Sequence, residues 1–148
     1  MGRLALFDHV RTISQRLRSE LEACVKPEAL AKAERVTRLG LRGNRPRVYI
    51  VAGLGGGTGS GMFIDMAYLV REQLRQMGYD HPEVIGLLFL PALVSQSSRA
   101  KQALANAYAA LTELNHFSSP RVVFSARYFS KQSPLRDAEA PFDRIIAW

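Results

Sequence analysis

The sequence has few of the features that mark secreted and membrane proteins. Its single cysteine, Cys24, excludes an internal disulfide and fits a reducing compartment. No apolar run approaches the ~20 residues that a membrane-spanning helix requires. The N-terminus has too short an apolar segment, and an acidic residue too early, for a secretory leader. We therefore expect a cytoplasmic protein without a membrane span.

Positive charge is concentrated in the first third of the chain. Of the net charge of +7, residues 1–47 contribute 11 Lys+Arg and 5 Asp+Glu, whereas residues 48–148 contribute 9 and 8. Such a segment can attract nucleic acid or an acidic partner. No aromatic residues interleave these charges, which recur at helical spacing. We therefore expect a solvated helical face, and nucleic acid is not an expected partner.

A glycine turn is the main motif of the chain. The strand formers Val48–Val51 lead into Gly55–Gly61, which reads GGGTGSG, and a helical pattern follows directly. Glycine costs backbone entropy on folding and has no side chain to bury, so five glycines in seven residues indicate close approach of a ligand to the main chain. Backbone N–H groups before a helix N-terminus bind anions. The hydroxyls of Thr58 and Ser60 are expected to donate to phosphate oxygens.

Other interpretations of the glycine turn fit less well. The P-loop pattern requires a lysine after the glycines, and none is present. The dinucleotide pattern GxGxxG can start at Gly55, but Ser60 stands at its sixth position, and the next strand does not end in an acidic residue. A plain glycine hinge would need neither the strand before it nor the helix after it.

Hydrophobic periodicity predicts an alternation of helices and strands. Two helices precede the turn, the first with an apolar stripe from Leu6 to Leu21 and the second from about Glu28 to Leu39, stopped by Gly40. Two strands are nearly all apolar and should be buried on both faces, as in a parallel sheet. The remaining expected elements are a helix from the glycines to near Gly78, the second strand at Val84–Leu90, a helix at Arg99–Phe117, a candidate strand at 121–129, a polar linker at 131–140 and the start of a strand at 142–148.

The loop after the second strand is expected to face the glycine turn. In open α/β sheets, ligands bind at the carboxyl ends of the strands. Pro91 ends the second strand, and the loop from Pro91 to Arg99 would therefore approach the same ligand. Its candidate side chains are Ser95, Ser97, Ser98 and Arg99.

Several polar residues on the expected helices have simpler structural interpretations. Asp65 lies more than one turn into its helix, which favours a structural role, and no metal site is expected. Asn106 is expected to make packing or hydrogen-bonding contacts, and His116 to interact with the C-terminal dipole of its helix. On that last helix, Leu104, Tyr108, Leu111 and Leu114 lie on one apolar stripe, and its many alanines should make it narrow and able to pack closely on the sheet.

The heptapeptide GGGTGSG resembles the nucleotide-binding signature of the tubulin/FtsZ superfamily of GTPases. Together with NAYAALTEL at 106–114 and Pro-Phe-Asp at 141–143, it is most similar to the bacterial tubulin-like proteins. The resemblance implies an α/β fold with a three-layer, Rossmann-like parallel sheet flanked by helices. Residues 1–148 would be an incomplete GTP-binding domain, with a helical lead-in at 1–47, the signature strand-loop-helix-strand-helix at 48–117, and an extended segment with a truncated strand at 118–148.

The resemblance also implies a ligand and its contacts. GTP or GDP would bind with its phosphates on the glycine turn, and Mg²⁺ could accompany the nucleotide. The complete protein could form a homo-polymer and hydrolyse GTP only when assembled. The family's first strand, its guanine-reading helix and its acidic catalytic loop have no counterpart here, so this segment should be inactive alone. The implied contacts are Gly55, Gly56, Gly57, Thr58, Gly59, Ser60, Gly61, Pro91, Ser97 and Arg99.

Two functions of other kinds stay open at the level of sequence. One is an enzyme domain with a Rossmann-like sheet that binds a dinucleotide or another phosphate ligand. The other is a non-catalytic tubulin-like scaffold that acts through its basic helices, whose partner binding would weaken steeply with salt.

Overall fold

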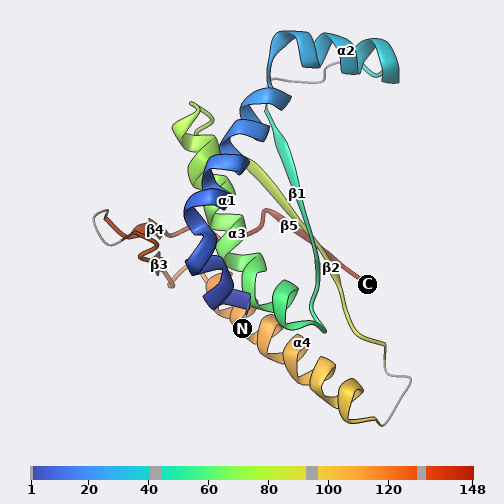
Figure 1. The fold of residues 1–148 in the computed structure, drawn as a ribbon, viewed down its shortest axis with the longest axis vertical. Helices are drawn as coiled ribbons and strands as arrows, with labels where there is room; N and C mark the ends of the chain where they lie inside the picture. The colour runs from blue at the N-terminus through green and yellow to red at the C-terminus, as the bar shows by residue number, and fades with distance from the viewer. Residues whose placement is uncertain (1, 41–44, 93–96, 130–132) are drawn as a thin grey trace.

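The computed structural model describes residues 2–40, 45–92, 97–129 and 133–148. A parallel sheet is flanked by helices, which confirms the predicted α/β class (Figure 1). The elements in chain order are α1 (Gly2–Cys24), α2 (Pro27–Thr37), β1 (Arg47–Gly53), α3 (Gly57–Gln76), β2 (Glu83–Phe89), α4 (Ser98–Phe117), β3 (Phe124–Ala126), β4 (Leu135–Asp137) and β5 (Arg144–Ala147).

The main sheet has the order β1-β2-β5 with all neighbours parallel. β1, α3 and β2 form the predicted βαβ unit. β5 lies beside β2, with Gly86 opposite Ile145, which confirms that the segment 142–148 contributes a strand. Because the strands are parallel, the glycine turn and the segment after β2 leave the sheet at the same edge, as predicted.

β1 is buried on one face, not on both. Its burial alternates, with Ala52 buried while Tyr49 is 51% exposed and Val51 is 63% exposed. The prediction of a strand buried on both faces was therefore wrong for β1. An all-apolar run shows that a strand can be buried, but it does not show what covers each face.

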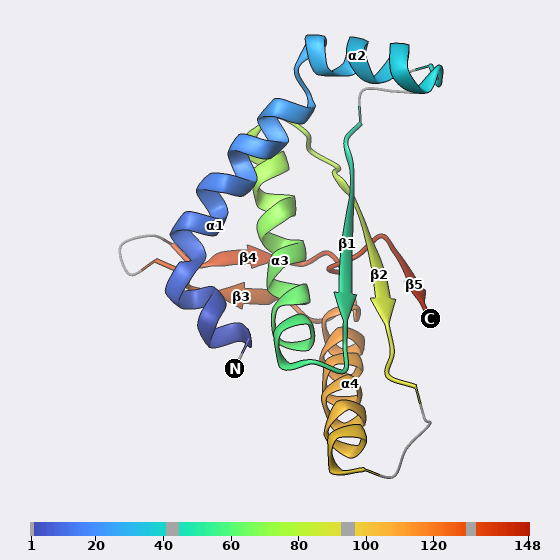
Figure 2. The same ribbon diagram turned by 45° about the vertical axis from the view of Figure 1, so that its right-hand side comes forward.

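α1 lies along α3, on the far side of α3 from the sheet (Figure 2). The predicted stripe is confirmed, since Leu6 and Val10 are buried against Leu69 of α3. Leu17 and Leu21 pack against the main core. Of the helices that the structure describes, none combines the length and hydropathy needed to cross a bilayer.

α2 ends earlier than predicted and stands apart from the sheet (Figure 1). It ends at Thr37, and Arg38, with a left-handed φ of 54°, donates its N–H to the Glu34 carbonyl at 2.8 Å. The cap is therefore Arg38 and not Gly40. None of the residues of α2 is buried.

α4 packs through its alanines, as predicted, and through Leu114, whereas two larger members of the predicted stripe are exposed. Tyr108 is 76% exposed and Leu111 is 38% exposed, whereas Ala107, Ala110 and Leu114 are buried. The small side chains let α4 approach α3 closely, and this contact turns the larger neighbours towards solvent.

The segment between α4 and β5 forms a short antiparallel pair that the sequence did not indicate. Only Phe124–Ala126 of the candidate strand at 121–129 is extended as β3, and it pairs with β4. β4 lies inside the stretch predicted as a polar linker. Phe124 is fully buried and its ring stacks on Tyr68 at a centroid distance of 3.9 Å, so tertiary packing selects this short strand.

Ion pairs fasten this C-terminal segment to α3. The guanidinium of Arg71 is almost fully buried and donates to Glu139 at 2.9 Å, to Asp143 at 2.7 Å and to the Pro141 carbonyl at 3.3 Å. The same Asp143 carboxylate accepts the Val84 N–H of β2 at 2.7 Å. The pairs therefore hold the chain where it enters β5.

Candidate functional site

The glycine turn is anchored by the residue that precedes it, Leu54. Leu54 is fully buried, and its N–H donates to the Phe89 carbonyl at the end of β2 at 2.8 Å. Gly56 is the N-cap of α3, which begins at Gly57. The sequence predicted a helix that begins directly after the glycines. The helix instead begins within them, at Gly57.

Three of the five glycines make close contacts within the protein itself, and at Gly59 no other residue fits. A Cβ at Gly55 would lie 3.2 Å from Pro91 Cβ and 3.3 Å from Ala103 Cβ. A Cβ at Gly59 would overlap the Gly53 carbonyl oxygen, and one at Gly61 would lie 3.2 Å from Gly2 Cα. The argument that packing cannot explain these glycines was therefore wrong for Gly55, Gly59 and Gly61.

The other two glycines face open space. A Cβ at Gly56 or Gly57 would meet no atom within 4 Å, and both residues are exposed together with Thr58. No side chain caps the start of α3, and its first turn holds no acidic residue. The first N–H groups of a helix have no partner within the helix. Gly56, Gly57 and Thr58 thus form an exposed surface, the open end of α3, where backbone donors and the helix dipole favour an anion.

The Ser60 hydroxyl is used within the turn. It donates to the Gly56 carbonyl at 2.6 Å, and the Ser60 N–H donates to the same oxygen at 3.2 Å. The hydroxyl proton is therefore bonded within the turn, and donation from Ser60 to a phosphate stays a prediction. The side chain fixes the position of the Gly56 carbonyl.

Asn106 of α4 holds the glycine turn from the side. Its amide donates to the Gly55 carbonyl at 3.0 Å, which confirms a hydrogen-bonding role. The sequence did not link Asn106 to the turn. The available signal was its position three residues after Ala103 and four before Ala110, on the small-residue face that packs inward.

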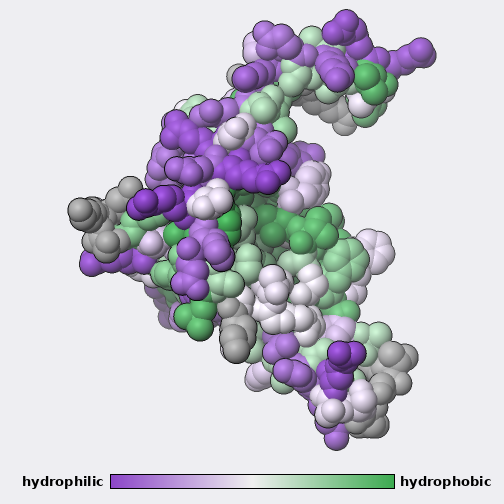
Figure 3. Space-filling view, in the orientation of Figure 1, coloured by the Kyte–Doolittle hydropathy of each residue, from purple (hydrophilic) through white to green (hydrophobic). Residues whose placement is uncertain are grey.

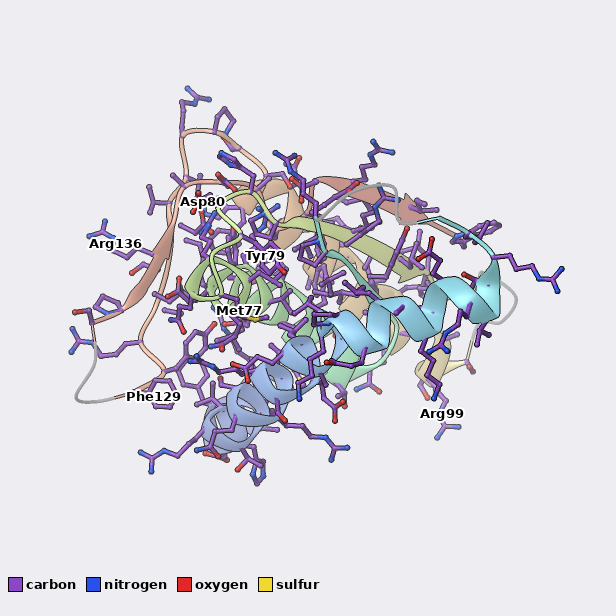
Figure 4. The ribbon with its side chains drawn as sticks, turned by 90° about the horizontal axis from the view of Figure 1, so that it is seen from above. Met77, Tyr79, Asp80, Arg99, Phe129 and Arg136 are labelled. Atoms are coloured by element: carbon purple, nitrogen blue, oxygen red, sulfur yellow. The ribbon has the colours of Figure 1, made fainter. Side chains whose placement is uncertain are left out.

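The loop after β2 approaches the glycine turn at Pro91. Pro91 lies against Gly55, as the short distance to a Cβ there shows. Ser97 is the N-cap of α4 and accepts the Ala100 N–H at 3.2 Å, and Ser98 is exposed. Arg99 is exposed and points outward from the first turn of α4 (Figure 4). Ser95 lies outside the described residues.

The start of α1 braces the open end of α3. Gly2 is buried there, and a Cβ on it would overlap the Gly57 carbonyl oxygen. The neighbouring Arg3 pairs with Asp65 of α3 at 3.1 Å and with Glu113 of α4 at 3.2 Å. This contact confirms a structural role for Asp65 and joins three helices next to the turn.

Tyr128 adds a hydrogen bond to the buried Asp65 carboxylate of this ion pair. Its hydroxyl donates to the Asp65 carboxylate at 2.6 Å. Burial, together with the neighbouring Asp65 charge, raises the pKa of Tyr128 above its usual range. The phenol therefore stays protonated at neutral pH and acts as a hydrogen-bond donor.

An apolar groove of about 400 Å³ runs from the first turn of α3 along β1, at the edge of the sheet. Figure 3 shows apolar side chains gathered over β1 on this side of the molecule. Thr58 and Gly59 line its end near the turn, and Leu17, Met62 and Met66 line its wall. Its lining has little polar surface, so the anion-binding character is confined to the turn.

The parallel sheet, with a glycine turn between its first strand and the following helix, defines an α/β protein of the Rossmann-like kind. The family model described as "Tubulin like" matches residues 1–147. The chain therefore belongs to the tubulin-like family. No curated protein and no solved structure matches it.

Proposed function

We propose that this chain binds GTP and GDP, and that the glycine turn holds the nucleotide phosphates. The observation that carries the proposal is the open end of α3, where Gly56 and Gly57 leave room for a ligand against bare backbone. The absence of a side-chain cap leaves the first amides of α3 for that ligand. Membership of the tubulin-like family favours a guanine nucleotide, and the resemblance to the bacterial branch remains part of this proposal.

The contacts divide into direct and supporting ones. The N–H groups of Gly56, Gly57 and Thr58, with the Thr58 hydroxyl, would bind phosphate oxygens. Gly55, Gly59, Ser60 and Gly61 shape the turn, and Pro91 supports it. Mg²⁺, where it accompanies the nucleotide, would be held through phosphate oxygens. Hydrolysis would require the complete, assembled protein.

The alternative of a dinucleotide enzyme has less support. That function uses a carboxylate at the end of the strand after the phosphate-binding helix. β2 ends at Phe89 and is followed by Leu90 and Pro91. The scaffold alternative predicts partner binding without nucleotide, and the experiment below separates it from nucleotide binding.

The test is nucleotide binding by the wild-type chain and by Gly57→Val, measured by isothermal titration calorimetry with GTP, GDP, guanosine and NAD. A Cβ at Gly57 meets no protein atom within 4 Å, so the fold should persist in Gly57→Val while the side chain blocks a phosphate. Loss of a charge-assisted hydrogen bond predicts binding weakened by at least about tenfold.

The control is Gly40→Val, since Gly40 is exposed, has equally open surroundings and lies outside the turn. It should bind GTP as the wild type does. Equal GTP affinity in Gly57→Val and the wild type would show that the glycine turn does not contact the nucleotide phosphates. Tighter binding of NAD than of GTP would favour the dinucleotide enzyme, and no nucleotide binding at all would favour the scaffold.

A further inference from the structure

We propose that Asn106 is a positioning residue of the phosphate site, an inference that rests on the proposed nucleotide binding. Asn106 is half-buried on α4, and its side-chain amide donates to the Gly55 carbonyl at 3.0 Å. This is the one side-chain hydrogen bond to Gly55 that the described residues provide. It fixes the direction of the peptide that joins Gly55 to Gly56.

The direction of this peptide determines where the Gly56 N–H points. The described residues contain no cis peptide bond. In a trans peptide, the C=O and the following N–H point in opposite directions. Since the Gly55 carbonyl points at α4, the Gly56 N–H points away from α4, and Gly56 itself is exposed. Within the described residues that N–H has no backbone acceptor.

The neighbouring contacts make this orientation specific. On one side of Gly55, Pro91 and Ala103 lie so close that a Cβ there would be 3.2 Å and 3.3 Å from them, so the turn packs tightly on this side. On the other side, the Ser60 hydroxyl holds the Gly56 carbonyl at 2.6 Å. Asn106 and Ser60 therefore hold successive carbonyls, and the N–H groups between and after them are presented together to an anion. Without Asn106, the Gly55–Gly56 peptide is free to rotate, and its N–H loses its alignment before the ligand arrives.

The ligand class follows from the geometry. A backbone N–H held in this way donates to a phosphate oxygen and makes no contact with a base or a ribose. The effect of Asn106 should therefore appear in the binding of nucleotides and not of nucleosides. This difference separates a positioning role from a general loss of structure, which would weaken both.

The test compares Asn106→Ala and Asn106→Asp with Asn115→Ala, an exposed asparagine on the same helix. Both Asn→Ala changes raise helix propensity alike, and Asn106→Ala in addition loses the hydrogen bond to Gly55, so it should melt somewhat below Asn115→Ala while both variants stay folded. Binding of GTP and GDP to Asn106→Ala should weaken roughly tenfold, the loss of about one charge-assisted hydrogen bond. Asn106→Asp cannot donate and places a carboxylate against the Gly55 carbonyl, so it should bind at least as weakly. Asn115→Ala should bind as the wild type does.

The outcomes distinguish this inference from the proposed function. If Asn106→Ala binds GTP as tightly as the wild type does, the positioning role of Asn106 is wrong, while the proposed nucleotide site at the glycine turn is retained. If the wild type binds no nucleotide, both the proposed function and this inference are refuted. An equal loss of guanosine and GTP binding would show a structural defect and overturn the inference. As a measurement without ligand, the backbone amide resonances of Gly55 and Gly56 should shift in Asn106→Ala and stay in place in Asn115→Ala. Unchanged resonances in Asn106→Ala would also overturn it.

Discussion

The buried guanidinium of Arg71 leads to an asymmetric prediction about stability. Its side chain is 2% exposed, whereas its partners Glu139 and Asp143 are 51% and 42% exposed. Replacing Arg71 by Met leaves two carboxylates that water can reach, and Met fills part of the buried volume. The loss then comprises the bonds to two half-exposed carboxylates and the longer, 3.3 Å bond to the buried Pro141 carbonyl, so the free energy of unfolding should fall by about 2 kcal/mol.

Neutralising the acids should cost more than removing the arginine. In the double variant Glu139→Gln, Asp143→Asn, the hydrogen-bonding shape is kept but a buried cation loses both counter-charges. Leaving a buried charge uncompensated costs about 3–5 kcal/mol. Urea denaturation at neutral pH, followed by circular dichroism, gives both values on one scale. If Arg71→Met proved more destabilising than the double variant, the attribution of the cost to a buried, unpaired cation would be refuted.

Two further predictions concern the glycine turn and the alkaline limit of stability. Gly59→Ala places a Cβ on the Gly53 carbonyl oxygen and should lower the free energy of unfolding by about 1–3 kcal/mol. In Gly57→Ala the added Cβ meets no atom within 4 Å, so the melting temperature should stay unchanged or rise slightly. Equal losses of stability in both variants would contradict the distinction between the exposed Gly57 and the enclosed Gly59. The pKa of Tyr128 is raised in the folded protein above its unfolded value of about 10. The protonated phenol therefore stabilises the fold fully below about pH 10, and this stabilisation is lost progressively as the pH rises from there towards the folded pKa. Melts between about pH 8 and 11 should show a smaller decline for Tyr128→Phe than for the wild type; parallel declines would exclude Tyr128 as the cause.

Sequence periodicity was sufficient for the elements that pack in repeating contacts. The stripe of α1, the βαβ unit and the final strand were all predicted, because each depends on local spacing of apolar residues. The glycine turn was placed correctly between a strand and a helix. Its exposed and enclosed glycines could not be separated, since that division depends on Pro91, Ala103 and Gly2, which are distant in sequence.

The features that sequence reasoning missed all depend on contacts between elements. β4 is a three-residue strand held by pairing with β3, and no three-residue pattern predicts such a strand. The exposure of Tyr108 follows from the alanines that bring α4 close to α3. Asn106 is an ordinary helical residue until the fold places the Gly55 carbonyl beside it.

The position of α1 sets an order for the folding of this chain. Its first turn pairs with partners that lie 62 and 110 residues later in the sequence. During synthesis α1 leaves the ribosome before α3 and α4 exist, so its apolar stripe remains in water at least until α3 has been made. Such a delay exposes a nascent chain to aggregation and to chaperone capture, and docking of α1 should be among the late steps of folding, after β1 and β2 have paired.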